Sequence, residues 1–555
     1  MIERPWLKNY PKGVPANIDP ERYATLTEML NGIFEQFKAN PAFTCMGKTL
    51  TYAEIDAQSK YFAAYLHSRG LEPGDKIALM MPNLLQYPVA LFGALRAGLV
   101  VVNTNPLYTP REMAHQFKDS GAKAIVIVEN FAANLEKIIA ETEIKTVILT
   151  SIGELLGFFK GGITNFVVRN VKGMVPKFNI PNTVSFTEAL NQGKKFTIKP
   201  FQGQPDDVIL LQYTGGTTGL SKGAMLTNRN MVANMEQVRA WMQPFVKDGN
   251  EIALCPLPLY HIFAFTVNCL VFMSFGAQNI LITNPRDMDG LIKEMSQYKF
   301  SMITGLNTLF NAMLNHADFS KLDFSKLKIT VGGGMAVQRP VAEKWQQVTG
   351  CFLAEGFGMT ESSPVVSCNP PDTSGKLGTI GLPLPSTEVR IWTEDGHEGT
   401  PGEIGEIQVK GPQVMKGYYN RPDETRRTIV DEWLCTGDIG MMDEDGFFKI
   451  VDRKKDMILV SGFNVYPNEI EEVVAGHPKV RECAAVGIPD EKSGEVVKIF
   501  VVKKDASLTA EEVIAYCRDN LTGYKIPKQV VFRDDLPKTN VGKILRRALR
   551  EDTKP

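Results

Sequence analysis

Helical patterns alternate with short apolar runs through the first half of the 555-residue chain. Residues 52–69 have helical spacing and are followed by the apolar run 76–81, and similar runs recur at 121–128 and 146–149. Runs this short and this apolar are typical of strands that are buried on both faces of a sheet. Their alternation with helices therefore predicts an α/β fold built on parallel or mixed sheets.

The second half of the chain has a different pattern of apolar and turn-forming residues. Beyond about Ser374, short strand patterns at residues 388–392, 405–410 and 447–451 are separated by glycine, proline and aspartate. This spacing predicts a small β-rich subdomain that follows the α/β region.

The charged segment 450–456 comes next, and we expect it to act as a hinge. The residues after it have their own amphipathic helix, at 468–475, and a second helix that begins near Thr509. We therefore predict a large N-terminal domain over residues 1–452 and a small, mobile α/β lid over residues 453–555.

Composition narrows the functional class. Apolar residues make up 44% of the chain and charged residues 22%, and the formal net charge is -1. These values are ordinary for a soluble globular enzyme and give no indication of a nucleic-acid-binding surface. The eight cysteines are scattered without a CxxC pair, so no disulfide framework is predicted. The N-terminus lacks the pattern of a signal peptide, and the reducing cytoplasm fits best.

Two apolar stretches raise the question of membrane contact. Polar residues and glycine interrupt residues 263–282, so a buried strand-helix-strand segment is favoured over a transmembrane span. Residues 155–178 combine large apolar side chains with lysine and arginine and contain no acid. Such a segment can lie on a membrane surface or form an ordinary basic surface helix or loop, and its composition leaves both open.

The most informative run follows the apolar strand pattern at 208–211. Adjacent glycines let a backbone turn sharply and approach an anion, threonine hydroxyls can donate to phosphate oxygens, and Lys222 adds positive charge. We therefore predict a polyphosphate-binding loop, with a flexible surface turn as the alternative. The loop has neither Walker A nor dinucleotide-fingerprint spacing. The residues of this predicted phosphate-binding loop are Tyr213, Thr214, Gly215, Gly216, Thr217, Thr218, Gly219, Leu220, Ser221, Lys222, Gly223 and Ala224.

Four further motifs follow in order, at residues 357–361, 433–438, 452–453 and 540–543. Together with the phosphate loop they resemble the adenylate-forming enzyme superfamily, in order and spacing, over nearly the whole chain. The stretch 405–547 is most similar to bacterial long-chain fatty acyl-CoA synthetases. The resemblance implies a large N-terminal domain and a small C-terminal domain that rotates between two half-reactions.

The resemblance also implies ligands for the nucleotide and a metal ion. Thr214 and Glu361 would hold Mg²⁺ on the ATP phosphates, with Glu361 the harder oxygen ligand. Asp438, helped by Arg453, would bind the ribose hydroxyls, and Phe357 would stack on adenine. The other residues expected along the nucleotide pocket are Gly333, Glu355, Gly358 and Thr360.

Lys543, Glu361 and His261 are the catalytic residues that the resemblance implies. Lys543 would stabilise the charge that accumulates on phosphoryl oxygens as the acyl carboxylate attacks the α-phosphorus. His261 would polarise or orient that carboxylate, although a lone histidine is more often an ordinary core residue. Gly462 would line the passage for CoA, where the lack of a side chain allows close approach, or would be a plain turn glycine.

The implied reaction has two steps, with Mg²⁺ as cofactor and ATP and CoA as co-substrates. A fatty acid and ATP give an acyl-adenylate and pyrophosphate, and CoA then takes the acyl group and releases AMP. A ligase for medium-chain or aryl acids, or a fatty-acid:AMP ligase, would carry the same motifs, so both stay open. A binding protein without turnover would not need both Glu361 and Lys543. We expect loose, peripheral association with the inner face of the cytoplasmic membrane, and we leave open whether the chain forms a homodimer.

Overall fold

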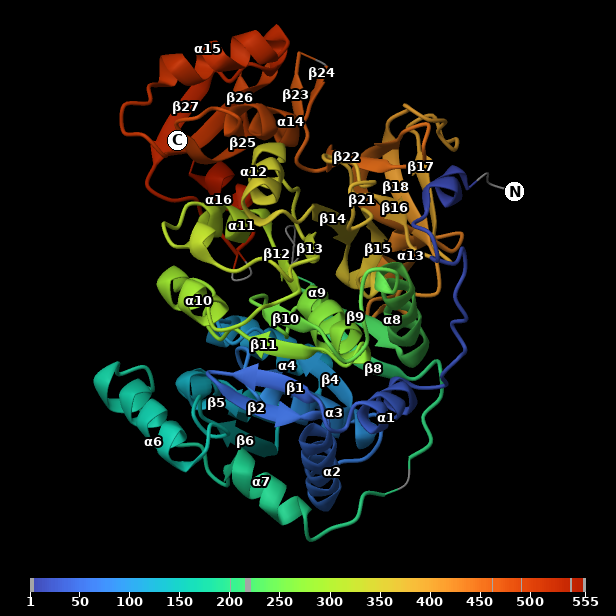
Figure 1. Cartoon of the computed structure of the whole chain (residues 1–555), viewed down its shortest axis with the longest axis vertical. Coiled ribbons are helices and arrows are strands. Elements are labelled where there is room, and N and C mark those ends of the chain that lie inside the picture. The colour runs from blue at the N-terminus through green and yellow to red at the C-terminus, as the bar shows by residue number, and fades with distance from the viewer. Residues whose placement is uncertain are drawn as a thin grey trace.

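The computed structural model describes residues 4–199, 201–214, 221–461, 463–490, 492–539 and 542–552 (Figure 1). They form two large sheets with helices between and outside them, a β-rich sheet, and a C-terminal α/β domain. The predicted fold class, a large domain of mixed α/β sheets with a β-rich part and a small C-terminal domain, is confirmed.

The first large sheet has nine strands and is mixed: the six inner strands from β14 to β1 pair in parallel, and the pairings at each end are antiparallel. Its strands, in spatial order, are β16 (Leu382–Pro383), β15 (Val365–Cys368), β14 (Leu353–Gly358), β13 (Ile329–Gly332), β12 (Met302–Gly305), β10 (Ile252–Cys255), β11 (Gln278–Leu281), β1 (Pro41–Cys45) and β2 (Lys48–Thr51).

The second large sheet has eight strands and is parallel except for the antiparallel pairs at the β9 end. In spatial order they are β19 (Gly417–Tyr418), β9 (Lys222–Thr227), β8 (Val208–Thr214), β4 (Val100–Asn103), β3 (Lys76–Met80), β5 (Ala122–Val128), β6 (Thr146–Thr150) and β7 (Val184–Ser185).

Both faces of the large sheets are buried, because alternate residues of a strand enter different cores. In β10, Ala253 and Cys255 belong to the largest core, which both sheets share, whereas Leu254 belongs to a second core on the outer face. The helices that contribute to the shared core include α1 (Leu26–Gln36), α2 (Tyr52–Ser68), α3 (Gln86–Arg96), α8 (Asn228–Met242), α9 (Ile262–Ala264) and the π-helix η5 (Phe265–Phe272). This double burial explains the continuous apolar runs in the sequence.

Further helices cover the outer faces of the large sheets. On the first sheet they are α10 (Met288–Met295), α11 (Asn307–Leu314) and α12 (Arg339–Thr349), and on the second α4 (Pro110–Ser120) and α5 (Ala132–Glu136). Near β6 and β7 lie α7 (Phe186–Gly193) and α6 (Phe158–Phe166), which continues as the π-helix η4 (Val167–Val171). The 3₁₀ helices are η1 (Pro5–Asn9), η2 (Glu129–Phe131), η3 (Ile139–Glu141), η6 (Phe319–Lys321), η7 (Thr360–Ser362) and η8 (Gly523–Lys525).

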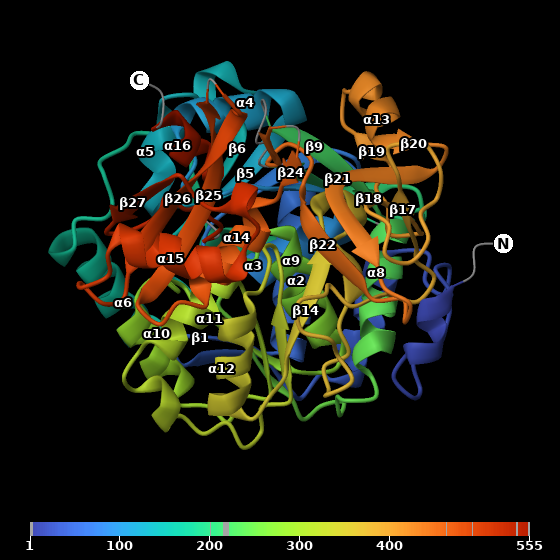
Figure 2. The same ribbon diagram turned by 90° about the horizontal axis from the view of Figure 1, so that it is seen from above.

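The β-rich subdomain and the C-terminal domain each have a five-stranded sheet. The first contains β17 (Glu388–Trp392), β18 (Gly405–Lys410), β21 (Trp433–Met442), β20 (Ile429–Val430) and β22 (Phe448–Arg453), with α13 (Pro422–Thr428) beside it. The second contains β24 (Phe463–Val465), β23 (Ile458–Val460), β26 (Gly494–Lys503), β25 (Val480–Asp490) and β27 (Gln529–Arg533), with α14 (Pro467–Ala475), α15 (Ala510–Asn520) and α16 (Arg546–Glu551). Figure 2 shows these two units side by side over the large domain.

Local signals explain why several helices begin where the sequence predicts. Thr51 starts α2 with a capping box, in which its side chain accepts from the backbone of Glu54 and the Glu54 side chain accepts from the Thr51 backbone. Thr509 and Glu512 repeat this arrangement at α15. Each box satisfies backbone donors that a helix start would otherwise leave unpaired.

The structure corrects one sequence prediction and qualifies another. The strand expected at the start of residues 263–282 is wrong, because this part is helical as α9 and η5, and only β11 at its end is a strand. All eight residues of η5 are buried, so the run lacked the polar face that reveals a helix. The predicted domain boundary at 452/453 falls inside the last residues of β22. Among the described residues, no helix has the length and apolar character needed to cross a bilayer.

Candidate active site

A cavity of about 1920 Å³ opens where the large domain, the β-rich sheet and the C-terminal domain meet. Strand ends and the loops after them supply most of its walls, which is where α/β proteins commonly bind ligands. It brings together residues that the sequence analysis chose from distant segments. These are Tyr213, Thr214, Lys222, His261, Gly333, Glu355, Phe357, Gly358, Thr360, Glu361, Asp438, Arg453 and Lys543.

The remaining predicted residues are placed differently. Gly215, Gly216, Thr217, Thr218, Gly219, Leu220 and Gly462 lie outside the described residues. Ser221, Gly223 and Ala224 do not line the cavity: the Ser221 carbonyl accepts from His115 Nε2 at 2.9 Å, Gly223 packs under the Tyr213 ring, and Ala224 is buried in the core. The Tyr213 hydroxyl donates a hydrogen bond to Asp119 at 2.8 Å, so its proton is directed to this carboxylate and not to a phosphate.

Glu361, Tyr418 and Lys222 form a polar cluster in the wall of the cavity. Glu361 is buried in η7, and its Oε1 accepts from the hydroxyl of Tyr418 on β19 at 2.5 Å. Lys222 lies over the Tyr418 ring, with Nζ 4.5 Å from the ring centroid, and pairs with Glu424 at 2.8 Å. Burial raises the pKa of Glu361, while the Tyr418 hydroxyl and Lys222 oppose the shift. A cation or a phosphate-bound metal ion near this carboxylate would favour its charged form.

Mg²⁺ fits these residues. It is usually held by one or two carboxylates together with substrate phosphates and water, rather than by a full protein cage. Glu361 supplies a buried carboxylate, and Thr214, at the end of β8, supplies a hydroxyl on the same cavity. No cluster of three or more potential ligands from His, Cys, Asp and Glu occurs in the part of the chain that the structure describes.

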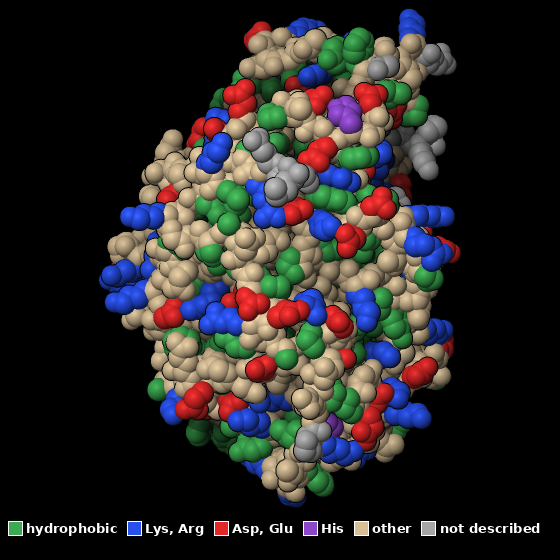
Figure 3. All heavy atoms as spheres, turned by 90° about the vertical axis from the view of Figure 1, so that its right-hand side faces the viewer, with side chains coloured by type: hydrophobic (Ala, Val, Ile, Leu, Met, Phe, Trp, Pro, Cys, Tyr) green, Lys and Arg blue, Asp and Glu red, His purple; other side chains and the backbone are tan. Residues whose placement is uncertain are grey.

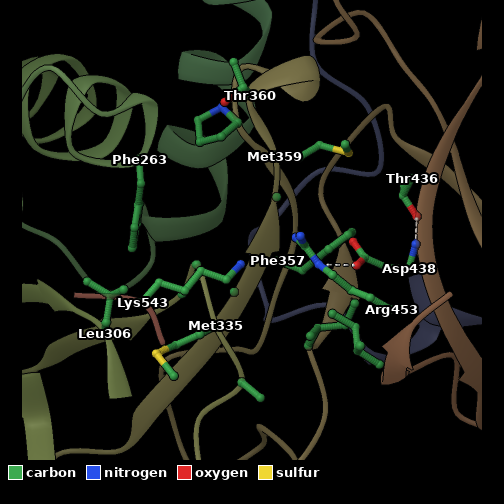
Figure 4. Close-up of a pocket in the computed structure, with 18 of the residues that line it drawn as sticks. Phe263, Leu306, Met335, Phe357, Met359, Thr360, Thr436, Asp438, Arg453 and Lys543 are labelled. Atoms are coloured by element: carbon green, nitrogen blue, oxygen red, sulfur yellow. Dashed lines mark hydrogen bonds and ion pairs between the residues drawn. The ribbon is translucent and has the colours of Figure 1, made fainter. Parts of the chain in front are cut away.

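Asp438 and Arg453 face each other across paired strands, in register on β21 and β22. Arg453 Nε lies 3.1 Å from Asp438 Oδ1, and the Asp438 backbone N–H donates to Thr436 Oγ1 at 3.1 Å (Figure 4). Asp438 is only 5% exposed, and burial raises its pKa against the opposing effect of Arg453 and Lys543. A carboxylate held in this way can accept bonds from two adjacent hydroxyls.

Lys543 enters the cavity from the C-terminal domain. Its backbone N–H donates to Thr539 Oγ1 at 3.0 Å, and the neighbouring Gly542 carbonyl accepts from Thr308 of α11 at 3.0 Å. Figure 4 shows the side chain extending into the cavity toward Phe357. Burial lowers the pKa of Lys543 to about 7, and Arg453 is the leading cation that adds to this effect.

His261 precedes α9 and lines the same cavity. Its Nδ1 accepts from the backbone N–H of Phe263 at 3.3 Å. Burial, with Lys543 nearby, lowers the pKa of His261 to about 4, so its imidazole is neutral near pH 7. The residue can therefore orient a ligand through a hydrogen bond from Nε2 but does not supply a positive charge.

Two other predicted residues shape the floor of the cavity. Glu355 on β14 accepts from the backbone N–H of Val337 at 3.1 Å, and burial raises its pKa to about 8. Gly358 passes so close to the Pro364 carbonyl that a Cβ would overlap it. Phe357 lies between these two residues on the strand, with its ring on the cavity.

Sequence reasoning missed two parts of this site. Tyr418 carries no motif of its own, and only the fold brings it to Glu361. The apolar lining of the cavity, called the apolar branch below, was also missed, because its residues come from α8, from α9 and the loop before it, and from strand β13 and the residue after β16. They include Val238, Trp241, Met242, Leu257, Ile262, Val331 and Leu384.

Comparison with known proteins agrees with this geometry. A family model described as AMP-binding enzyme matches residues 33–419, which is more than half of the chain. The chain belongs to the AMP-binding enzyme family. The C-terminal domain model of AMP-binding enzymes matches residues 469–543, which include Lys543.

Relatives in the AMP-binding family match the chain from end to end. Long-chain-fatty-acid--CoA ligase of Escherichia coli O157:H7 is 56% identical over 554 residues, covering 100% of this chain and 99% of that protein. The protein of the same name from Yersinia pestis is 57% identical over 552 residues, covering 99% and 98%.

Solved AMP-binding structures have the same fold. ATP-bound MatB from Rhodopseudomonas palustris has a TM-score of 0.80 at 27% identity, covering 95% of this chain and 98% of that one. The anthranilate CoA ligase AuaEII in complex with anthranoyl-AMP has a TM-score of 0.86 at 22% identity, covering 96% and 99%. At that identity the second likeness shows the fold alone.

Proposed function

We propose that the protein is a long-chain fatty acid:CoA ligase of the AMP-forming type. The observation that carries the proposal is end-to-end identity of 52–57% with curated proteins named long-chain-fatty-acid--CoA ligase. In the first step, a carboxylate oxygen of the fatty acid attacks the α-phosphorus of ATP, and pyrophosphate leaves. In the second, the CoA thiolate attacks the acyl carbonyl, and AMP leaves.

The nucleotide would occupy the polar part of the cavity. Asp438, fixed by Arg453, would accept bonds from the ribose hydroxyls, and Phe357 would stack on the adenine. Thr214 and Glu361 would hold Mg²⁺, which neutralises phosphate charge when bound. The phosphate loop would supply backbone and hydroxyl donors to the same phosphates.

Lys543 would act in the first step. Negative charge grows on the phosphoryl oxygens as the carboxylate attacks, and a positioned ammonium group stabilises that charge more than it stabilises the ground state. Nucleotide phosphates would themselves raise the pKa of Lys543, which keeps it protonated when it is needed. His261, neutral at pH 7, would orient the carboxylate rather than activate it.

The apolar branch would hold the acyl chain. Val238, Trp241 and Met242 on α8 line the same cavity as His261, so an acyl chain packed against them would leave its carboxylate in the polar part of the cavity. Burying each methylene of a chain against such walls is favourable by about 0.8 kcal/mol. A long chain therefore gains more from this branch than a short one.

The C-terminal domain would act as a mobile lid that begins at residue 453. Its hydrogen bonds to α11 include Asn311 Nδ2 to the Arg481 carbonyl at 2.8 Å, and such exposed contacts are easily exchanged for water. Rotation about residues 452–453 would withdraw Lys543 and bring Gly462 to the passage for CoA. This motion separates the two steps in one active site.

The fatty-acid substrate partitions into bilayers, so we place the protein loosely on the inner face of the cytoplasmic membrane. Binding of this kind is peripheral and reversible.

The test measures pyrophosphate release and CoA consumption with palmitate, oleate, octanoate and 4-coumarate. We expect efficient CoA-dependent turnover of palmitate and oleate. Best activity on octanoate or 4-coumarate would replace the substrate with a medium-chain or aryl acid. Pyrophosphate release without CoA consumption would identify a fatty-acid:AMP ligase, and no release with any acid would overturn the proposal.

A further inference from the structure

Large apolar side chains are unusually exposed on one helical segment, α6 and η4 with the turn that follows. Phe158 is 90% exposed and Phe159 is 81% exposed. Other large apolar side chains that are exposed on the segment are Ile163, Phe166, Val171 and Met174. Elsewhere in the described residues, exposed large apolar side chains occur singly or in small groups, so this docking face (residues 158–174) is the main concentration.

The docking face is held firmly from behind. Gly161 packs against the Gly153 carbonyl so closely that no side chain would fit, and the Gly153 N–H donates to Asn165 Oδ1 at 2.8 Å. Arg169 donates two hydrogen bonds of 2.9 Å to Glu129. Inward-facing groups thus fix the rotation of the helix, and its phenylalanines point outward because of that rotation.

Charge on this segment has one sign. Residues 155–178 contain four basic residues and no acid. Arg169 is paired with Glu129, but Lys172 and Lys177 are exposed and have no acidic partner within the described part of the chain. A cluster of aromatic side chains with free lysines beside it matches a surface that is apolar inside and anionic outside.

The position of the docking face leaves the lid free to move. In Figure 1, α6 lies at the opposite end of the molecule from the C-terminal domain. Contact through α6 would therefore not obstruct rotation of the lid. By contrast with the docking face, the face shown in Figure 3, on the other side of the molecule from α6, has basic and acidic side chains interspersed, as is usual for a surface in water.

We infer that the docking face binds the surface of an anionic phospholipid bilayer. The inference rests on the proposed function, since an enzyme for long-chain acids meets its substrate in membranes. The helical segment is too short to span a bilayer. It instead inserts Phe158, Phe159, Ile163 and Phe166 among the headgroups and outer acyl carbons, while Lys172 and Lys177 contact lipid phosphates.

The first test is cosedimentation of the full chain with vesicles made of equal parts of phosphatidylcholine and phosphatidylglycerol. Phe158→Ser combined with Phe159→Ser should lower the partition coefficient by at least about tenfold. Val171→Asp should lower it as well, whereas Val430→Asp, a matched change at an exposed valine on β20, should leave it unchanged. Equal binding by the wild type and the double phenylalanine variant would overturn the inference.

The second test separates charge from apolar contact. Lys172→Ala combined with Lys177→Ala should weaken binding by about fivefold for each lysine. The loss should disappear on vesicles of phosphatidylcholine alone, where the anionic partner is missing. A variant that binds both vesicles as the wild type does would refute the role of the lysines and the anionic assignment.

Turnover of octanoate in the absence of vesicles keeps this inference distinct from the proposed function. All surface variants should retain CoA-dependent turnover of this water-soluble acid, which also shows that they fold. Absence of turnover of both octanoate and palmitate in the wild type would contradict the ligase assignment and not the docking face. A dimer that the double phenylalanine variant dissociates, together with no vesicle binding, would instead assign the face to a second copy of the chain.

Discussion

Replacement of Lys543 by alanine tests the first half-reaction most directly. The Lys543 side chain extends from the C-terminal domain into the cavity, where burial lowers its pKa to about 7. Two unit charges about 4 Å apart interact by about 4 kcal/mol at an effective dielectric constant of about 20. If the lysine contributes a large part of that energy to the transition state only, its loss slows adenylation by roughly 100- to 1000-fold.

The assay follows pyrophosphate release with palmitate under single-turnover conditions. Lys543→Ala should show this loss, while Lys528→Ala, which removes an exposed lysine of the same domain, should release pyrophosphate at the wild-type rate. Thioester formation from added palmitoyl-adenylate and CoA should change less than about tenfold, because no charge develops on a phosphoryl group being attacked. A decrease of less than about tenfold in adenylation would refute the assigned role.

The lowered pKa of Lys543 also predicts how the rate of adenylation depends on pH. The protonated form is the active one, so kcat/KM for ATP, which reports the free enzyme, should fall as pH rises through about 7. Lys543→Arg stays charged throughout this range and should abolish that fall, although its geometry lowers the rate. Persistence of the fall in Lys543→Arg would show that another group titrates.

Three further predictions test the neighbouring groups. Asp438→Asn removes the carboxylate paired with Arg453 and should raise the KM for ATP at least about tenfold in steady-state assays, whereas an unchanged KM would exclude a ribose contact. Tyr418→Phe removes the hydroxyl that donates to Glu361 and favours its charged form, while burial raises the pKa of this carboxyl. Half-maximal adenylation should therefore require about five- to tenfold more Mg²⁺. An unaltered Mg²⁺ titration would contradict this role of Tyr418. Burial raises the pKa of Glu355 from 4.5 to about 8, so the folded state binds more protons and stability falls as pH rises between these values, by at most about 1.4 kcal/mol per pH unit. Glu355→Gln should flatten this dependence in urea unfolding, and equal slopes would argue against a buried neutral carboxyl.

Local signals in the sequence determined most elements and their order. The strands expected at residues 388–392 and 405–410 coincide with β17 and β18, because alternating side chains and flanking glycines mark strand ends locally. The helix predicted to begin near Thr509 is α15, and the structure shows that Thr509 caps its first turn. The start of the 263–282 stretch was misread because burial on all sides removes the periodicity that such signals need.

The sequence also predicted several side chains that line the cavity, including Thr214, Glu361, Asp438 and Lys543, because each of them stands in a local motif. Only the tertiary structure decided how these groups interact. The bond from Tyr418 to Glu361 joins residues on different elements, and the pKa values of Lys543 and His261 depend on burial by segments far away in the chain. Desolvation and charge coupling act through space, so no pattern of neighbouring residues encodes them.

The segment 155–178 shows the same division. Its composition predicted either a membrane-facing or an ordinary basic surface segment, and both remained open because composition does not state which side of a helix is covered. The contact of Gly161 with Gly153 and the pairing of Arg169 with Glu129 decided that the phenylalanines face outward. The sequence thus supplied the side chains and their local geometry, and packing against distant residues decided which of them meet solvent, substrate or one another.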